Sequence, residues 1–481
     1  MTAPIPTDTD SPASDRYRPD VRHTRLGAEF YDEVKAADFP KTVLRFRNDR
    51  AAASVGLDHL GDEDWIRHFG RFQPLPGNMA APLALRYHGH QFRVYNPDLG
   101  DGRGFLFAQM RDAAGRLMDL GTKGSGQTPW SRAGDGRLTL KGGVREVLAT
   151  ELLEALGVNT SKSFSLIETG EALTRGDEPS PTRSAVLVRL NHSHVRIGSF
   201  QRLLYLEDHA GLKQLLDYSI AEYWPEAADA PSPAARFLEL VVDAVAKMGA
   251  QWFAAGFVHG VLNTDNITIT GESFDYGPWR FLPVFDPQFT AAYFDHQGLY
   301  SFGRQPDALF WNLARLGECL IPLADMEDLK AVLDRFPERF EAALADATLK
   351  RLGIARDEPG RDYRLANLFY AALREAGSPF ERAFFDMAGG AAAERLAASP
   401  VAYTSDAWTA VIGALRDRAA TAAAAAALAM PPFTTGTPVT MLIDEVEAIW
   451  APIAAEDDWS LFEAKIAAVR ELGKATRLLA G

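Results

Sequence analysis

The chain has 481 residues, 47% of them hydrophobic and 24% charged, which is typical of a globular protein with a sizeable core. Its formal net charge of -14 argues against general nucleic-acid binding, because phosphate contacts require clustered Lys and Arg. The single cysteine, Cys319, excludes a disulfide within the chain and a cysteine-rich zinc site. We interpret it as a core residue of a protein in a reducing, cytoplasmic compartment, because its neighbours are apolar.

The N-terminal segment is polar and acidic and has no apolar signal region, so residues 1–20 are predicted to be a disordered leader. Residues 21–205 are predicted to form a small lobe of strands, turns and a few helices. Its helix is expected over residues 144–156, where Leu148 and Leu152 continue a four-residue spacing and Gly157 suits a helix end. The strands of this lobe are expected at residues 104–110, 116–121, 163–168 and 185–190.

Residues 206–481 are predicted to form a larger, helical lobe. Its clearest helix covers residues 235–255, where apolar side chains recur with the 3.6-residue period, and Gly256 ends it. Residues 257–306 are turn-rich and polar, and the rest is almost wholly helical. The Ala-rich stretch at 419–430 is expected to be a helix of this lobe, because alanine is too weakly apolar to hold it in a membrane. No membrane partner is therefore expected.

Glycine-rich turns mark two candidate phosphate-binding loops in the small lobe. Gly100 and Gly102 precede Arg103, and Asp135 precedes Gly136. Glycines let backbone N–H groups approach a phosphate, and an arginine can pair with it. Each turn alone is equally typical of a plain hairpin.

Lys123 ends a predicted strand, and Glu146 follows 23 residues later on the predicted helix. Kinases orient their ATP-binding lysine with a helix glutamate in this order. A surface lysine before the flexible turn Gly-Ser-Gly is the alternative.

Arg189 and Arg196 flank a predicted turn, where two guanidinium groups can hold a terminal phosphate. Two solvated surface arginines are the alternative. His192 and His194 lie between them, but zinc is disfavoured because no cysteine complements them.

The most informative segment runs from His259 to Asp275. A strand-like run at 267–270, a turn at Gly271 and a second short strand are predicted to bring Asp275 back beside Asn266. With Asp265, this places two carboxylates and an amide oxygen around one point, which suits Mg²⁺ or Mn²⁺ holding nucleotide phosphates. A polar hairpin with capping Asn and Asp is the alternative.

Together these motifs resemble the selenoprotein O family of kinase-like protein adenylyltransferases. The resemblance extends from about residue 87 to residue 313, and more loosely to the C-terminus. It rests on the order and spacing of LGDGR (99–103), KGSGQTP (123–129), SRAGDGR (131–137), VRE (144–146), NTDN (263–266), DYGP (275–278) and FDP (285–287). The resemblance implies an α+β, protein-kinase-like bilobal fold with a mixed small N-lobe and a larger helical C-lobe.

The resemblance also implies site roles and a reaction. Asp265 would be the catalytic base, and Asn266 and Asp275 would hold the metal beside the nucleotide. Lys123, positioned by Glu146, would contact phosphate. The other residues expected to line the nucleotide site are Gly100, Gly102, Arg103, Asp135, Gly136, Arg189 and Arg196. ATP would bind flipped relative to ordinary kinases, so that AMP passes to Ser, Thr or Tyr hydroxyls of protein substrates.

This chain departs from the family pattern at two places. Arg93 stands where the family usually has glycine, and Lys-Gly-Gly occupies 141–143 where Arg-Ser-Ser is typical. Neither is a proposed catalytic position, so both bear on local packing. Two other functions remain open from the residues alone: a metal-dependent phosphotransferase, and a non-catalytic pseudokinase that binds partners.

Overall fold

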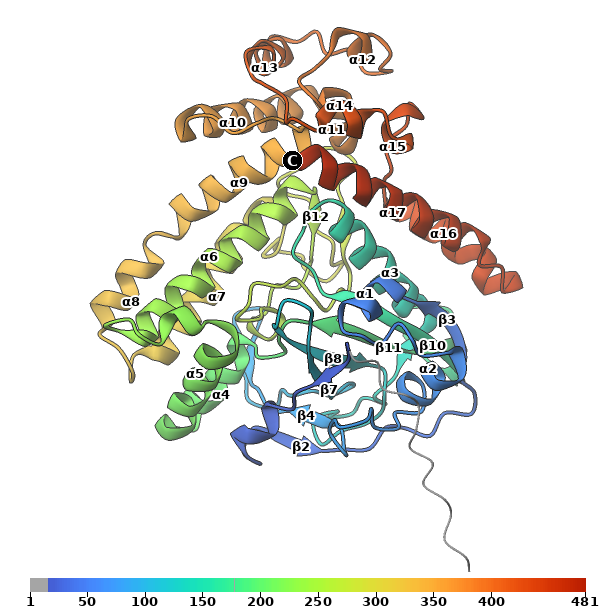
Figure 1. Ribbon diagram of the computed structural model, residues 1–481, viewed down its shortest axis with the longest axis vertical. Coiled ribbons are helices and arrows are strands. Elements are labelled where there is room, and N and C mark those ends of the chain that lie inside the picture. Colours follow the sequence, from blue (N-terminus) through green and yellow to red (C-terminus); the bar gives the residue numbers. More distant parts are fainter. Residues whose placement is uncertain (1–15, 177) are drawn as a thin grey trace, which may run out of the picture. The chain divides into compact units, whose positions relative to one another are not determined.

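The computed structural model describes residues 16–176 and 178–481, in which a large antiparallel sheet combines with many helices (Figure 1). The chain forms two compact units. Of the described residues, unit 1 comprises 16–89, 95–144, 161–176 and 178–228, and unit 2 comprises His90–Val94, Arg145–Thr160 and Asp229–Gly481. The boundary expected at 205/206 thus falls inside unit 1. The kinase-like bilobal arrangement remains a prediction.

The predicted leader only partly overlaps the described chain. Residues 1–15 lie outside the described residues. Residues 16–20 differ from the expectation, because Tyr17 is buried and β1 (Arg18–Pro19) pairs with β7 (Leu106–Arg111).

Over its described residues, unit 1 is built on a nine-stranded antiparallel sheet with the order β2-β4-β7-β8-β11-β10-β3, to which β1 adds at β7 and β9 at β11. Its other strands are β2 (Tyr31–Glu33), β3 (Val43–Arg47), β4 (Leu83–Leu85), β8 (Leu117–Lys123), β9 (Leu138–Thr139), β10 (Lys162–Leu173) and β11 (Thr182–Asn191). All four strands predicted for the small lobe are confirmed as β7, β8, β10 and β11. A separate hairpin pairs β5 (Gly89–Gln91) with β6 (Val94–Asn96).

Side chains of the central strands alternate between two chemically different faces. On β8 and β11, Leu120, Val188 and Leu190 join the apolar core that includes Trp65 of α2 (Asp62–Phe69). The Trp65 ring stacks on Phe164 at 4.9 Å between centroids. The opposite face carries polar and charged residues, because neighbours in a strand point to opposite sides.

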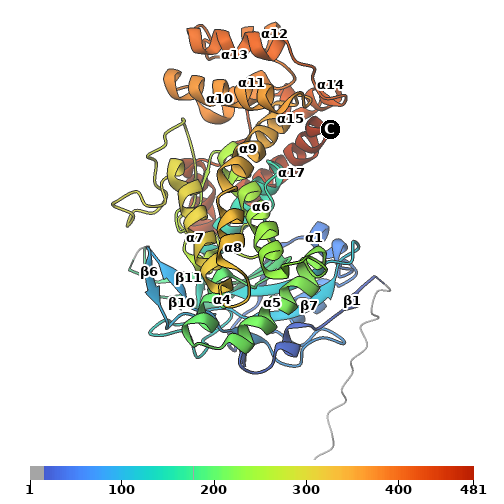
Figure 2. The same ribbon diagram turned by 90° about the vertical axis from the view of Figure 1, so that its left-hand side faces the viewer.

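The remaining helices of unit 1 either lie between strands in the chain or follow β11. They are η1 (His23–Leu26), α1 (Asp49–Ser54), α4 (Ile197–Tyr205), α5 (His209–Tyr223) and η2 (Pro225–Ala227). Figure 2 shows α4 and α5 next to each other.

Unit 2 is organised around α6 (Pro233–Ala254), which confirms the helix predicted at 235–255. Its buried face carries Phe237, Val241 and Trp252, and Gly256 follows it with a φ of 62°. Helix α9 (Phe336–Leu352) lies along α6 (Figure 1). The predicted helix at 144–156 is confirmed as α3 (Leu140–Ala155), most of which belongs to unit 2.

The segment after α6 is turn-rich, as predicted, and the chain beyond it is helical. Its elements are β12 (Phe257–Val258), η3 (Thr264–Asn266), β13 (Arg280–Phe281), η4 (Phe302–Arg304), α7 (Gln305–Leu320), α8 (Met326–Leu333), α10 (Pro359–Ala376), α11 (Phe380–Met387), α12 (Ala393–Ala397), α13 (Asp406–Arg416), α14 (Ala424–Leu428), α15 (Pro431–Thr434), α16 (Ile443–Glu456) and α17 (Ser460–Ala480). Within the described residues, none of these helices has the length and apolarity to span a bilayer.

The Ala-rich stretch at 419–430 is helical only over α14. The backbone N–H of Ala355 donates to the carbonyl of Ala419, and the N–H of Thr421 donates to the carbonyl of Gly353. These bonds hold residues 419–421 against the chain that follows α9, so the helix begins later than predicted. The buried-core interpretation of Cys319 is confirmed: it lies on α7 and is 1% exposed, and burial raises the pKa of its thiol.

Candidate active site

The polar face of the unit 1 sheet carries two of the predicted phosphate-binding cations. Lys123 at the end of β8 pairs across the sheet with Leu187, and Arg189 on β11 pairs with Gly121. Lys123 and Arg189 are therefore diagonal neighbours on one face of the sheet. Both are buried, with 4% and 5% of their surfaces exposed. A buried cation needs compensating groups or an anionic ligand, so the surface interpretation of both residues is wrong.

Arg196 lies at the N-terminus of α4, after the turn that follows β11. Its guanidinium group stacks over the Tyr87 ring at 4.3 Å and donates to the Asp101 carboxylate at 3.1 Å. The pKa of His194 is lowered, first by burial and then by the positive charges of Arg189 and Arg196, against the opposing effect of Asp119. The structure thus brings both arginines into electrostatic reach of one histidine.

Asp119 anchors the turn that lies between the two arginines. Its carboxylate accepts the backbone N–H of His194 at 2.9 Å and the amide of Gln109 at 2.8 Å, and it lies 3.2 Å from His194 Nδ1. Sequence reasoning missed this role, because nothing near Asp119 in the sequence indicates its partner 75 residues later. His192 instead packs edge-on against Tyr223 at 5.5 Å.

The turn at Gly100–Arg103 packs tightly on Trp130. A Cβ on Gly100 would overlap the indole ring, and a Cβ on Gly102 would lie 2.8 Å from the Trp130 carbonyl oxygen. Between the two glycines, the Asp101 carboxylate also accepts the backbone N–H of Leu85 at 3.1 Å. These glycines are thus required by packing, and their contact with a nucleotide remains a prediction. Arg103 is exposed and forms no ion pair among the described residues.

The turn at Asp135–Gly136 is held by its own contacts. Gly136 has a φ of 69°, and a Cβ there would overlap the backbone of Gly126. The Asp135 carboxylate pairs with Arg175 at 2.7 Å. Partial burial raises the pKa of Asp135, but hydrogen bonds from Arg175 and from the Arg137 backbone outweigh it and lower the pKa. The nucleotide-lining role of this turn also remains a prediction.

In unit 2, the predicted hairpin after Asn266 does not form. Thr268 is a single β-bridge residue and residues 269–270 form a turn, so the run at 267–270 is not a strand. The Thr268 hydroxyl accepts the backbone N–H of Glu272 at 3.2 Å and donates to its carbonyl at 3.1 Å, and Gly271 occupies the left-handed region with a φ of 61°. A hydroxyl-stabilised turn therefore replaces the strand pair, because Thr268 satisfies the backbone groups that a strand partner would take.

Asp265 and Asn266 lie in η3, a single helical turn. The Asn266 side-chain nitrogen donates to the carbonyl of Val261 at 3.0 Å, which leaves the amide oxygen on the opposite side of its planar group. Two further bonds fix the loop around η3. The Asn312 amide donates to the Leu262 carbonyl at 2.9 Å, and the backbone N–H of His90 donates to Thr264 Oγ1 at 2.7 Å.

Asp275 has a strained backbone. Its φ is 62°, in the left-handed region that residues other than glycine rarely adopt. The fully buried His259 lies next to this strain, with Nε2 3.0 Å from the carbonyl oxygen of Phe274. The backbone N–H of His259 donates in turn to Gln305 at 3.0 Å. Such strain persists only where surrounding contacts hold it, and it concentrates at functional sites.

That Asn266 and Asp275 hold a metal together with a nucleotide remains a prediction. Within residues 16–176 and 178–481, no three His, Cys, Asp or Glu side chains are grouped to hold a metal by themselves. Asn266 and Asp275 supply one amide oxygen and one carboxylate. Magnesium is commonly bound by one or two such ligands together with substrate phosphates and water.

Glu146 of α3 is 2% exposed. Burial raises the pKa of Tyr276 first, and the negative charge of Glu146 raises it further, so Glu146 lies near the residue that follows Asp275. Lys123 belongs to unit 1 and Glu146 to unit 2, so their ion pair remains a prediction.

Comparison with known proteins identifies the family. The model of the family described as "Protein adenylyltransferase SelO" matches residues 14–470. The chain belongs to this family. Similar SelO-family proteins are each named "Protein nucleotidyltransferase YdiU". That of Gloeobacter violaceus is 46% identical over an alignment of 462 residues, and the match covers 93% of each chain. That of Synechococcus elongatus is 54% identical over 335 residues, 69% of this chain and 67% of the relative. That of Vibrio cholerae is 39% identical over 361 residues, 75% and 73% of the two chains.

Membership of the SelO family confirms the resemblance inferred from the motifs. It also confirms that the protein is a nucleotidyltransferase, which disfavours the non-catalytic pseudokinase. The comparisons do not test single residues, so the role of each site residue rests on the geometry above.

Proposed function

We propose that this SelO-family protein transfers AMP from ATP to Ser, Thr or Tyr hydroxyls of protein substrates. The observation that carries the proposal is the group of buried cations on the polar side of the unit 1 sheet: Lys123, Arg189 and Arg196. A phosphate group carries up to about two negative charges near neutral pH, more than one lysine offsets. Two additional guanidinium groups match a β,γ-diphosphate, which would leave the α-phosphate to the acceptor.

The transfer itself is a displacement at the α-phosphorus. The hydroxyl oxygen of the acceptor forms a bond to this phosphorus, the bond to the oxygen bridging the α- and β-phosphates breaks, and pyrophosphate leaves. The Asp265 carboxylate accepts the proton of the hydroxyl. Its place in a loop fixed by the bonds of Asn312 to Leu262 and of His90 to Thr264 supports this role, because a general base must be held in one position to act.

Asn266 and Asp275 would hold a divalent cation, Mg²⁺ or Mn²⁺. When bound, the cation offsets negative charge on the phosphates. The bond from Asn266 to the Val261 carbonyl orients the amide oxygen as a ligand. The contact of His259 with the Phe274 carbonyl holds Asp275 in its strained backbone conformation. These two contacts would orient the two proposed ligands before the nucleotide arrives.

The proposal is tested with ATP labelled separately at the α- and γ-phosphates, an acceptor protein mixture and the full chain. The α label should become protein-bound and the γ label should remain in pyrophosphate. Asp275→Asn should abolish labelling, whereas Asp328→Asn, at an exposed position on α8, should leave it unchanged. Transfer of the γ label would refute adenylyl transfer and favour the phosphotransferase.

A further inference from the structure

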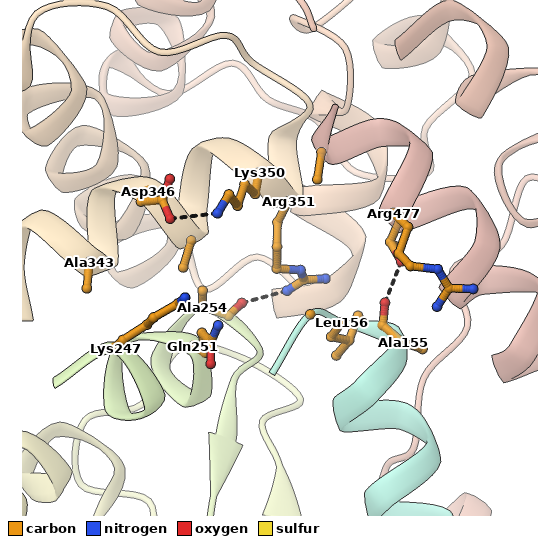
Figure 3. A pocket seen from close by; sticks show the side chains of 14 residues that line it. Ala155, Leu156, Lys247, Gln251, Ala254, Ala343, Asp346, Lys350, Arg351 and Arg477 are labelled. Carbon is orange, nitrogen blue, oxygen red and sulfur yellow. Dashed lines mark hydrogen bonds and ion pairs between the residues drawn. The ribbon is translucent and has the colours of Figure 1, made fainter. Parts of the chain in front are cut away.

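Unit 2 contains a cavity that no part of the proposed reaction uses. Its volume is about 170 Å³, and it lies among the C-terminal end of α3 and the helices α6, α9 and α17 (Figure 3). Four cationic side chains and one carboxylate line it: Lys247, Lys350, Arg351, Arg477 and Asp346. This excess of positive charge stands out in a chain whose formal net charge is -14.

Two of the cations are already neutralised. Arg351 is 8% exposed, and its guanidinium group pairs with Glu381 at 2.5 Å and donates to the Ala254 carbonyl at 2.6 Å. Lys350 pairs with Asp346 at 2.9 Å. These contacts fix Arg351 in the wall of the cavity, where Figure 3 shows it reaching from α9 toward Ala254.

Within the part of the chain that the structure describes, the other two cations have no such partner. Among the described residues, neither the Lys247 nor the Arg477 side chain forms an ion pair or a hydrogen bond. Figure 3 shows the Lys247 amine on α6 directed toward Ala254, and Arg477 extending outward from α17. Gln251 adds an uncommitted donor, because its side-chain oxygen accepts the backbone N–H of Asn159 at 2.9 Å while its amide nitrogen has no partner among the described residues.

We propose that this cavity binds a small phosphate-bearing anion. The positive charge of Lys247 offsets part of the charge of a phosphate group, and the N–H groups of Arg351 and Gln251 supply directed donors. The remaining wall is apolar, with Leu156, Ala254 and Ala347, and accommodates the carbon part of a small ester. A cavity of roughly 150 Å³ holds a benzene-sized molecule, so phosphate or a small phosphomonoester fits and a nucleotide does not.

Binding would join the four helices that form the wall. The Thr476 hydroxyl of α17 already donates to the carbonyl of Ala155 at the end of α3. A ligand held by α6 and α9 at the same place would add to this connection, so it should stabilise the folded chain in proportion to its concentration.

The test is calorimetric titration of the full chain with inorganic phosphate, pyrophosphate and glycerol 3-phosphate, which separates the free ion and the leaving group from an ester. Lys247→Met keeps the apolar stem and removes the charge. It should weaken binding of the preferred anion at least tenfold. Gln251→Glu keeps the shape and places a carboxylate in the site, so it should abolish both binding and the rise in Tm with phosphate. Lys330→Met, on α8 where the side chain is 65% exposed, is the matched control and should bind like the wild type.

Wild-type affinity in both Lys247→Met and Gln251→Glu, or the absence of binding by the wild type at millimolar phosphate, would overturn the proposal. If anions bound only at the proposed nucleotide site, both variants would keep wild-type affinity. The labelling assay with ATP is independent of this titration, so a failure of adenylyl transfer would leave the phosphate result standing.

Discussion

Replacing Arg196 by methionine separates two roles of one side chain. In the free protein, Arg196 neutralises the buried Asp101 and stacks on Tyr87. Removing one partner of a buried ion pair costs roughly 3–5 kcal/mol of stability. We expect the lower end of this range, because the Asp101 carboxylate still accepts a hydrogen bond from the backbone N–H of Leu85. The double variant Arg196→Met/Asp101→Asn should recover most of the loss, since no buried charge then lacks a partner.

The second role is measured on binding. A hydrogen bond to a charged group contributes about 1.5–3 kcal/mol, and 1.4 kcal/mol is a tenfold change in affinity. Arg196→Met should therefore weaken ATP binding about 10- to 150-fold and leave AMP binding nearly unchanged, because AMP lacks the distal phosphates. Arg196→Lys should fall between the two, since lysine keeps the charge and loses the planar fork.

The assay is calorimetry with ATP and AMP on both single variants and on the double variant, together with urea unfolding. Equal losses for ATP and AMP would contradict the flipped pose. ATP affinity restored by the double variant would show that Arg196 acts only through Asp101, and the reasoning would fail. The parallel variant Arg189→Met should show the same preference for AMP over ATP.

Three further predictions follow from other parts of the structure. Asp275→Gly should relieve the left-handed backbone strain and keep the fold, yet lose nearly all transfer activity. Circular dichroism measures the fold, and transfer of the α label from ATP measures the activity. Retained turnover would show that Asp275 is not part of the metal site. Burial lowers the pKa of His23 and of His192 from 6.5 to about 4, so the unfolded chain binds more protons between these values. Stability should therefore fall as the pH drops from about 6.5 to 4, by at most roughly 1.4 kcal/mol per pH unit for each histidine, and His192→Phe should reduce the slope in urea unfolding. Arg470→Met removes the side chain that donates two hydrogen bonds of 2.9 Å to Glu151, which is 3% exposed. It should lower the free energy of unfolding by roughly 3–5 kcal/mol. An unchanged midpoint of urea unfolding would show that the pair is solvated.

The strongly periodic elements could be predicted from the sequence. The helix α6 and the strands β7, β8, β10 and β11 were expected within a few residues of their bounds. Their positions follow from local patterns, since apolar spacing and glycine stops act within a window of ten or twenty residues.

The failures arise where a distant group or a single hydroxyl overrides the local pattern. The run at 267–270 has β-branched residues and alternates like a strand, but the Thr268 side chain closes a turn instead. The Ala-rich stretch has high helix propensity, but its first residues form backbone hydrogen bonds with residues 353–355 instead of joining the helix. Sequence spacing likewise gave no sign that Asp119 holds His194, because only the fold places them together.

The bond between Glu151 and Arg470 spans 319 residues of sequence. During synthesis, α3 leaves the ribosome long before α17. The Glu151 carboxylate, which is buried in the folded protein, therefore has no ion-pair partner until Arg470 of α17 has been synthesised. Contacts between residues so far apart in the sequence form late and slowly in folding. Until they form, the nascent chain exposes the surfaces that these contacts will bury. Unit 2 should therefore complete its folding only after α17 has been synthesised, and chains stalled before residue 470 should be bound by chaperones and proteases.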